Sequence, residues 1–241
     1  YIERIASRLA RRGHEVTLVC AAHSLAPPLE LRDGVRIIRR GSKLTVYAEA
    51  QRLLRSGALG RLDVVVDTQN GLPFFASTAS RVPTVILVHH VHREQWPVVY
   101  GPVRSRIGWW IESRLAPRAF RRLRYIAVSR ATARELNELG VDANRISVIT
   151  NGTDFAPVRE SPLPPTPRIL VLGRLVPHKR VEHVLLAAAK LRESFPDLRV
   201  DVVGSGWWAE ELRVAARLTG VEDIVDFAGQ VSDAEKVRFI Q

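Results

Sequence analysis

Sulfur is nearly missing from this chain. Its 241 residues include no methionine and one cysteine, Cys20. A single thiol cannot form an internal disulfide, which excludes a disulfide-stabilised scaffold and indicates a reducing compartment. Because Cys20 ends an apolar stretch, we expect it to be a small buried side chain, with a reactive thiol as the alternative.

Long hydrophobic runs are missing as well. No apolar stretch reaches the roughly 18 residues that a transmembrane helix requires, and no secretory leader pattern is visible. We therefore expect a cytoplasmic protein, with peripheral contact at the inner face of the cell membrane left open. The pattern is already helical at Tyr1 and still helical at Gln241, so we interpret the chain as a fragment of a longer protein.

Acidic residues are scarce relative to basic ones. The chain has 25 Asp and Glu against 36 Lys and Arg, a formal net charge of +11. An anionic membrane, a phosphorylated small molecule and nucleic acid are all compatible with this charge. No nucleic-acid recognition motif accompanies it, so we expect no nucleic-acid partner. The apolar fraction of 46% suffices for a sizeable core in a chain of this length.

Strand-like and helix-like patterns alternate along the first part of the chain. Asp63 to Asp67 is a continuous apolar run, as expected for a strand buried on both faces of a parallel sheet. Ser129 can cap the helix that follows it. The patterns predict strands over 15–20, 34–39, 63–67, 83–88, 124–128 and 145–149, and helices over 1–12, 46–54, 72–80, 103–115 and from 129.

A segment with five prolines, 155–167, separates this part from a second alternating part. There the patterns predict strands over 168–172, 198–203 and 224–227, and helices over 181–194, 207–218 and from 232. Alternation of this kind indicates parallel βαβ units. We therefore expect an α/β protein with Rossmann-like, doubly wound parallel-sheet domains over 1–154 and 168–241, joined by a linker over 155–167. With three strands, the second domain is incomplete.

Two cations stand between the strand and the helix that open the second part. Arg174 follows the strand and Lys179 comes five residues later, before the helix begins. An arginine fork, a lysine charge and the free N–H groups of a helix N-terminus together suit a diphosphate. Ordinary surface cations are the alternative, although cations are unfavourable at a helix N-terminus.

Three histidines, His89, His90 and His92, follow the strand over 83–88. The carboxyl ends of strands in α/β sheets face ligand clefts, so these side chains are candidates for contact with a ligand. Structural packing is the alternative for them. A metal site is disfavoured because no matching carboxylate or cysteine group appears at an obvious spacing.

The segment Gly204-Ser-Gly206-Trp-Trp-Ala209 fits G-x-G-x-x-A, a fingerprint of dinucleotide binding. It follows the second strand of its part, whereas the fingerprint belongs to the first strand-to-helix turn. Binding of NAD or FAD and plain turn geometry both stay open for this segment.

Seven arginines surround Trp109 and Trp110 within the segment 103–124. A basic stretch with tryptophans can lie on an anionic bilayer. The alternative is a solvated helix whose tryptophans pack on the core of the first domain.

Several of these motifs, in this order and spacing, resemble the group 1 (family four) glycosyltransferases, which retain anomeric configuration and have the GT-B fold. The resemblance covers nearly the whole chain. Its residues are Arg11-Arg-Gly-His-Glu-Val-Thr-Leu-Val19, Val88-His-His-Val-His-Arg-Glu-Gln-Trp96, Ala127-Val-Ser129, Val148-Ile-Thr-Asn-Gly-Thr-Asp154, Gly173-Arg174 with Lys179, Val202-Val-Gly-Ser-Gly206 and Phe227-Ala-Gly-Gln-Val-Ser232.

The resemblance implies roles for these residues. His92 would act near the reacting carbon of the donor sugar, and Arg174 and Lys179 would neutralise the diphosphate of a UDP- or GDP-sugar. Gly204 and Gly206 would lie on the nucleotide side, and Gly229 and Val231 would approach the base through their backbone. No cofactor or metal is implied, in agreement with the absence of an Asp-x-Asp motif. By topology, Asn70 and His90 would line the acceptor side.

The implied reaction is transfer of a sugar to a lipid-linked or glycan acceptor, in the synthesis of a cell-envelope polysaccharide or glycolipid. The alternatives are a nucleotide-sugar epimerase of the same fold and a nucleotide-binding module without catalysis. The family's glycine-rich loop before the first helix and its Glu-x7-Glu segment have no counterpart within residues 1–241. We therefore expect the fragment by itself to be inactive.

Overall fold

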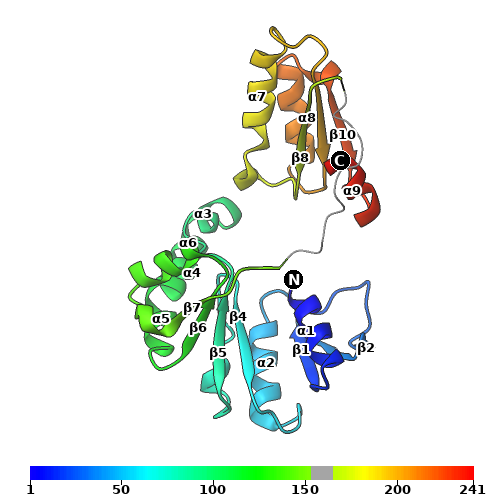
Figure 1. Ribbon diagram of the computed structural model, residues 1–241. Coiled ribbons are helices and arrows are strands. Elements are labelled where there is room, and N and C mark those ends of the chain that lie inside the picture. Colours follow the sequence, from blue (N-terminus) through cyan, green and yellow to red (C-terminus); the bar gives the residue numbers. More distant parts are fainter. Residues whose placement is uncertain (153–164) are drawn as a thin grey trace. The chain divides into compact units, whose positions relative to one another are not determined.

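The structure, a computed structural model, describes residues 1–152 and 165–241. It contains two compact units, Tyr1–Gly152 and Thr153–Gln241 (Figure 1). Most of the expected linker, 155–164, lies outside the described residues, as does Asp154.

The first unit begins with a small sheet of order β1-β3-β2. Strands β1 (Val16–Cys20) and β3 (Val35–Arg39) are parallel, and β2 (Leu29–Arg32) pairs with β3 in the antiparallel sense. Helix α1 (Ile2–Arg11) contributes Ala6 to their shared core. Strand β2 was not predicted from the sequence, because its Leu-Glu-Leu-Arg pattern is short and largely exposed.

A sheet of order β4-β5-β6-β7 forms the rest of this unit. Its strands, all parallel, are β4 (Val65–Gln69), β5 (Thr84–Val88), β6 (Arg124–Ala127) and β7 (Ile146–Val148). The prediction for 63–67 was wrong in two ways. The strand begins two residues later, and Val64 and Val66 are more than half exposed. In the described part of the chain, β4 has a paired strand only on its β5 side and is therefore an edge strand of its sheet.

The helix expected over 72–80 is also wrong. The connection from β4 to β5 contains only the short 3-10 turn η1 (Ala76–Thr78). The carboxylate of Asp67 accepts hydrogen bonds from the backbone N–H groups of Phe74 and Ala76, both at 2.9 Å. These bonds bind the loop to the strand, and Phe75 between them takes a left-handed backbone conformation that a helix excludes.

Helices cover the β4–β7 sheet, and their buried residues build a core around Phe120 and Tyr125 (Figure 1). Ser129 caps α6 as predicted, since its hydroxyl accepts the N–H of Thr132 at 3.0 Å. A π-helical segment, η2, joins α4 to α5 without a break. The helical elements of this unit after α1 are α2 (Val46–Ser56), α3 (Gln95–Val99), α4 (Pro102–Trp110), η2 (Ile111–Leu115), α5 (Ala116–Ala119), α6 (Arg130–Glu138) and η3 (Ala143–Arg145).

The second unit has a parallel sheet of order β10-β9-β8. Its core is formed by residues such as Leu185, Val200 and Leu212, which come from helices and strands in turn. A reciprocal capping box between Ser232 and Glu235 opens the last helix. The elements are β8 (Arg168–Leu172), η4 (Pro177–Lys179), α7 (Val181–Leu191), β9 (Arg199–Val203), α8 (Ala209–Leu218), η5 (Glu222–Ile224), β10 (Val225–Gly229) and α9 (Asp233–Ile240).

Candidate functional site

Polar side chains meet where β4 and β5 end. Gln69 of β4 lies beside Val88 of β5, so the residues that follow both strands share one edge of the sheet. Asn70 follows β4, and its side-chain oxygen lies 2.9 Å from Nε2 of His92. The His90 ring lies against the His92 ring, with centroids 4.1 Å apart. The structure therefore brings together the three predicted residues Asn70, His90 and His92.

A buried carboxylate, that of Glu112, contacts both the backbone and the ring of His92. The side chain of Glu112 has 0% exposure, against 14% for His92. It receives the backbone N–H of His92 at 3.1 and 3.3 Å, and His92 Nδ1 lies 3.2 Å from Oε1. The indole N–H of Trp96 donates to the other oxygen at 2.7 Å. Three donors thus converge on one buried carboxylate, which satisfies a charge that would otherwise be costly to bury.

This contact bears on which nitrogen of His92 carries a proton. Where the carboxyl group of Glu112 is ionised it can only accept a hydrogen bond, and Nδ1 is then the donor. Nε2 then faces the amide of Asn70. With the amide oxygen toward the ring, Nε2 also donates and the ring is an imidazolium. With the amide rotated by 180°, its NH2 group donates to the lone pair of a neutral ring. In both arrangements Nε2 is the nitrogen on the exposed side.

Two glycines create the space for Trp96. A Cβ at Gly108 of α4 would lie 2.4 Å from the Trp96 ring, and one at Gly71 would lie 3.0 Å from it. Gly108 is four residues before Glu112, so both occupy the same face of the helix. Glu112 itself lies in the π-helical segment, a distortion that is frequent at functional sites. The two glycines thus leave the space in which the Trp96 indole reaches the Glu112 carboxylate.

Asp67 supports the other half of the cluster. Its two hydrogen bonds to Phe74 and Ala76 hold the loop that begins at Asn70. Burial raises the pKa of the Asp67 carboxyl, and the two backbone N–H donors partly oppose that rise.

The contacts of His89 are with residues outside the Asn70–His90–His92 cluster. Its carbonyl accepts the hydroxyl of Thr132 at 3.0 Å, and its ring packs edge-on against Tyr1. Burial lowers the pKa of the His89 ring. Within residues 1–152 and 165–241, no group of three or more His, Cys, Asp or Glu is arranged to hold a metal ion.

The predicted cations of the second unit lie in the loop between β8 and α7. Arg174 and Lys179 are both exposed. No hydrogen bond or ion pair holds either side chain within the described part of the chain. Lys179 ends the 3-10 turn η4, and Arg180 in a left-handed conformation leads directly into α7. Both cations therefore lie, unpaired among the described residues, in the loop that leads into α7, and their binding of a diphosphate stays a prediction.

Gly204 and Gly206 pack against this same loop. A Cβ at Gly204 would lie 1.9 Å from the carbonyl oxygen of Gly173, and one at Gly206 would lie 2.0 Å from that of Leu175. The N–H of Leu175 also donates to the carbonyl of Ser205 at 3.0 Å. A fingerprint glycine leaves room for a pyrophosphate, whereas here protein backbone fills that room. The packing argues against the dinucleotide interpretation and makes both glycines supports of the cation loop.

The last predicted residues lie at the neighbouring strand end. The carbonyl of Gly229, at the end of β10, accepts the N–H of Gly204 at 2.7 Å. Val231 is half-buried just beyond it, and Gln230 between them contacts the hydroxyl of Ser205 at 3.2 Å. The turns after β8, β9 and β10 thus form one connected edge that carries Arg174, Gly204, Gly206, Gly229 and Val231.

Sequence reasoning missed Glu112, Trp96 and Asp67. A signal for Glu112 was present, because it is the single acidic residue in the arginine-rich segment 103–124. An isolated carboxylate in such a segment is expected to have a specific partner. Nothing in the local pattern identified that partner as His92, since the two are twenty residues apart.

Comparison with protein families agrees with this geometry. Residues 1–157 match the model of Glycosyltransferase Family 4, and residues 158–241 match that of Glycosyl transferases group 1. The chain belongs to glycosyltransferase family 4. No curated protein matches the sequence of the chain.

Solved glycosyltransferase structures share the fold. WaaG, involved in lipopolysaccharide biosynthesis, matches with a TM-score of 0.70 and 17% identity over 98% of this chain and 67% of its own. HepE of Anabaena in complex with UDP matches with a TM-score of 0.60 and 18% identity over 91% of this chain and 70% of its own. WaaB, a lipopolysaccharide outer core galactosyltransferase, matches with a TM-score of 0.53 and 14% identity over 93% and 70%. The α/β fold with parallel sheets is therefore of the GT-B type, as predicted.

Proposed function

We propose that the protein transfers a sugar from a nucleotide diphosphate sugar to an acceptor, with retention of anomeric configuration. The observation that carries this proposal is the loop between β8 and α7, where Arg174 and Lys179 are exposed without a partner among the described residues. Negative charge develops on the departing diphosphate in this reaction. A guanidinium fork and an ammonium group stabilise that charge more strongly in the transition state than in the ground state, without a metal ion.

His92 supports the reaction from the first unit. Its ring is held by Glu112, which leaves Nε2 on the exposed side. In the proposed mechanism this group contacts the donor sugar near the reacting carbon. Asn70 and His90 line the acceptor side, and the backbone at Gly229 and Val231 approaches the base.

The similar structures support the substrate classes. HepE structures contain UDP and UDP-glucose, which favours a UDP-sugar donor here, with a GDP-sugar as the alternative. WaaG and WaaB act in lipopolysaccharide synthesis, which favours a lipid-linked or glycan acceptor of the cell envelope. We place the reaction at the cytoplasmic side of the membrane. No helix among the described residues is long and apolar enough to cross a bilayer.

The test is turnover by the full-length protein with a panel of UDP- and GDP-sugars, with and without glycolipid and glycan acceptors. The anomeric proton coupling of the product reports retention. Arg174→Ala/Lys179→Ala is expected to lower kcat/KM by about a hundredfold or more. The matched control is Lys190→Ala/Arg199→Ala. It also removes one lysine and one arginine charge, but from exposed positions at the end of α7 and the start of β9.

Each alternative has its own outcome. Interconversion of the donor sugar without any acceptor would identify an epimerase. Tight nucleotide binding without turnover would identify a binding module. Unchanged turnover in the Arg174→Ala/Lys179→Ala protein would contradict the proposed donor site.

A further inference from the structure

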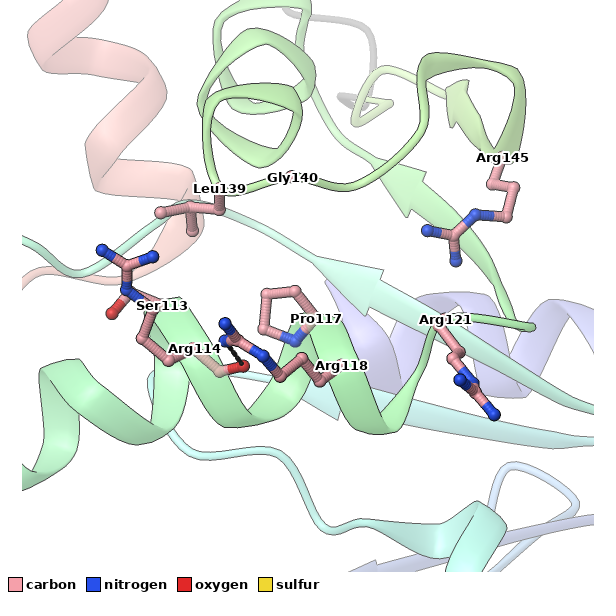
Figure 2. Close-up of a pocket in the computed structure, with 8 residues that line it drawn as sticks. All are labelled: Ser113, Arg114, Pro117, Arg118, Arg121, Leu139, Gly140 and Arg145. Atoms are coloured by element: carbon pink, nitrogen blue, oxygen red, sulfur yellow. Dashed lines mark hydrogen bonds between the residues drawn. The ribbon is translucent and has the colours of Figure 1, made fainter.

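Aromatic and polar side chains border the Asn70–His90–His92 cluster in the first unit. They come from the loops that follow β3, β4 and β5, and the last two of these loops also carry the cluster. A groove of about 650 Å³ with four arginines in its lining lies in another part of the unit, since its walls come from η2, α5, the end of α6 and η3 (Figure 2). The loop residues are therefore the ones that extend the candidate site.

A row of aromatic rings leads away from His92. The Trp96 ring lies 6.5 Å from the His92 ring, and the Tyr100 ring lies 5.3 Å from the Trp96 ring, measured between centroids. The Nζ atom of Lys43, in the loop after β3, lies 5.3 Å from the centroid of the Tyr100 ring. This distance is that of a cation–π contact. The rings thus connect His92 with an ammonium group that follows a different strand.

Tyr47, in the first turn of α2, belongs to the same surface. Its ring packs against that of Phe74, in the loop after β4, with centroids 4.8 Å apart. Burial raises the pKa of the Tyr47 hydroxyl, and the charges of Tyr100 and Asp67 add to the rise. Such an effect between two charges falls with distance, which places Tyr47 near Tyr100. The Tyr47 hydroxyl therefore keeps its proton at neutral pH and can donate it in a hydrogen bond.

The polar atoms of this surface are available to a ligand. No hydrogen bond or ion pair among the described residues engages the ammonium of Lys43 or the hydroxyls of Tyr47 and Tyr100. Lys43 is exposed, and both tyrosines are partly exposed. The Asp67 carboxylate is 2% exposed and already accepts two backbone N–H groups. One ammonium and two O–H donors therefore remain beside an aromatic surface.

We propose that Lys43, Tyr47 and Tyr100 bind an anionic group, a carboxylate or a phosphate, of the sugar acceptor. The ammonium neutralises the charge and the phenols donate to its oxygens, because hydrogen bonds to an ionised acceptor are about twice as strong as those to a neutral one. The rings of Tyr47, Phe74 and Tyr100 offer apolar surface to the C–H groups of a sugar ring. The inference rests on the proposed function, in which the acceptor binds beside His92, and it names the chemical class of that acceptor.

The experiment is a ligand-observed NMR titration of the full-length protein with glucose, galactose and mannose, each compared with its 6-phosphate and its uronate. Within each set the sugar ring is the same and only the group at one end differs. A parallel series contains UDP, so that the proposed donor loop is filled. At least one charged sugar is expected to bind about tenfold or more tightly than its neutral parent. The tighter of phosphate and carboxylate identifies the anionic group.

Variants assign this preference to individual side chains. Lys43→Gln is expected to weaken binding of the charged sugar about tenfold and to leave that of the neutral sugar unchanged, whereas Lys43→Arg keeps the preference. Tyr47→Phe/Tyr100→Phe is expected to weaken binding of the charged sugar about threefold or more. Lys43 is the single lysine of residues 1–152, so the charge control is Arg52→Gln, an exposed position of α2. Circular dichroism confirms that each variant is folded.

Two results would overturn the proposal. The first is the absence of any preference for the charged sugars in the wild type, failure of all the sugars to bind included. The second is an equal loss of affinity in Lys43→Gln and Arg52→Gln, which would mean attraction by net charge alone. Sugar binding is measured without a donor sugar or turnover, so its failure is distinct from failure of the proposed transferase activity.

Discussion

The carboxylate of Glu112 accepts the backbone N–H of His92, and its Oε1 lies 3.2 Å from Nδ1 of the same residue's ring. One residue thus contacts both the backbone and the ring of the histidine. A carboxylate behind a histidine ring is a common means of fixing the tautomer of a functional imidazole.

Glu112→Gln is expected to destabilise the first unit by about 1–3 kcal/mol. A glutamine offers one acceptor oxygen and places an NH2 group among three donors, so at least one buried N–H loses its partner. The measurement is the free energy of unfolding from urea titration. Glu138→Gln, an exposed change at the end of α6, is the control and is expected to stay within about 0.5 kcal/mol of the wild type. Equal stability of the two variants would contradict the role assigned to Glu112.

The tautomer of His92 can be observed directly. Long-range proton–nitrogen NMR spectra are expected to show Nδ1 protonated in the wild type, with Nε2 as the nitrogen whose signal responds to substitution of Asn70. In Glu112→Gln the Nδ1 signal is expected to change. A neutral ring protonated only at Nε2 in the wild type would show that the contact with Glu112 does not hold in solution.

Gly204→Ala is expected to cost well above the roughly 1 kcal/mol of an ordinary left-handed glycine, because its Cβ meets the Gly173 carbonyl at 1.9 Å. It should also weaken nucleotide binding by displacing the loop that carries Arg174. Gly220→Ala is the matched control, since Gly220 also has a positive φ but a Cβ there meets nothing within 4 Å. Urea unfolding of both variants gives the comparison, and equal costs would contradict the packing role.

The buried carboxyl group of Asp67 is expected to make the free energy of unfolding depend on pH in a defined direction. Burial raises the pKa of its carboxyl, so the folded state favours the protonated form more than the unfolded state does. Its contribution to stability is therefore full below the unfolded pKa of about 3.9 and is lost as the pH rises through the folded value. The free energy of unfolding of the wild type minus that of Asp67→Asn is expected to fall from about pH 4 upward. A rise over that range would mean that the two N–H donors outweigh burial.

The sequence predicted the parallel elements well because each has its own periodic pattern. The predictions were wrong for segments whose conformation depends on contacts with residues distant in the sequence. The 72–80 segment is apolar enough for a helix, yet the backbone N–H groups of Phe74 and Ala76 donate to the buried Asp67 carboxylate instead of to helix carbonyls. The short strand β2 depends on a hairpin turn at Asp33-Gly34, where both residues have positive φ. An Asp-Gly pair of this kind is a hairpin signal that is independent of strand periodicity.

For the candidate site, residues that follow strand ends were predictable and their supports were not. Asn70 and His92 could be placed because parallel strands end at one edge. Glu112 reaches His92 only through the packing of a helix twenty residues away and through the room that Gly108 leaves for Trp96. That room is a property of packing, which no local pattern encodes.

In the proposed donor site, the loop between β8 and α7 binds the diphosphate of a nucleotide sugar. Isothermal calorimetry of the full-length protein with UDP, GDP, ADP and NAD, each in the presence of EDTA, measures that binding. One nucleoside diphosphate is expected to bind, with an affinity about tenfold or more weaker in Arg174→Ala/Lys179→Ala and unchanged in Lys190→Ala/Arg199→Ala. Binding of NAD alone, or equal affinity for a nucleoside diphosphate in both double variants, would contradict it.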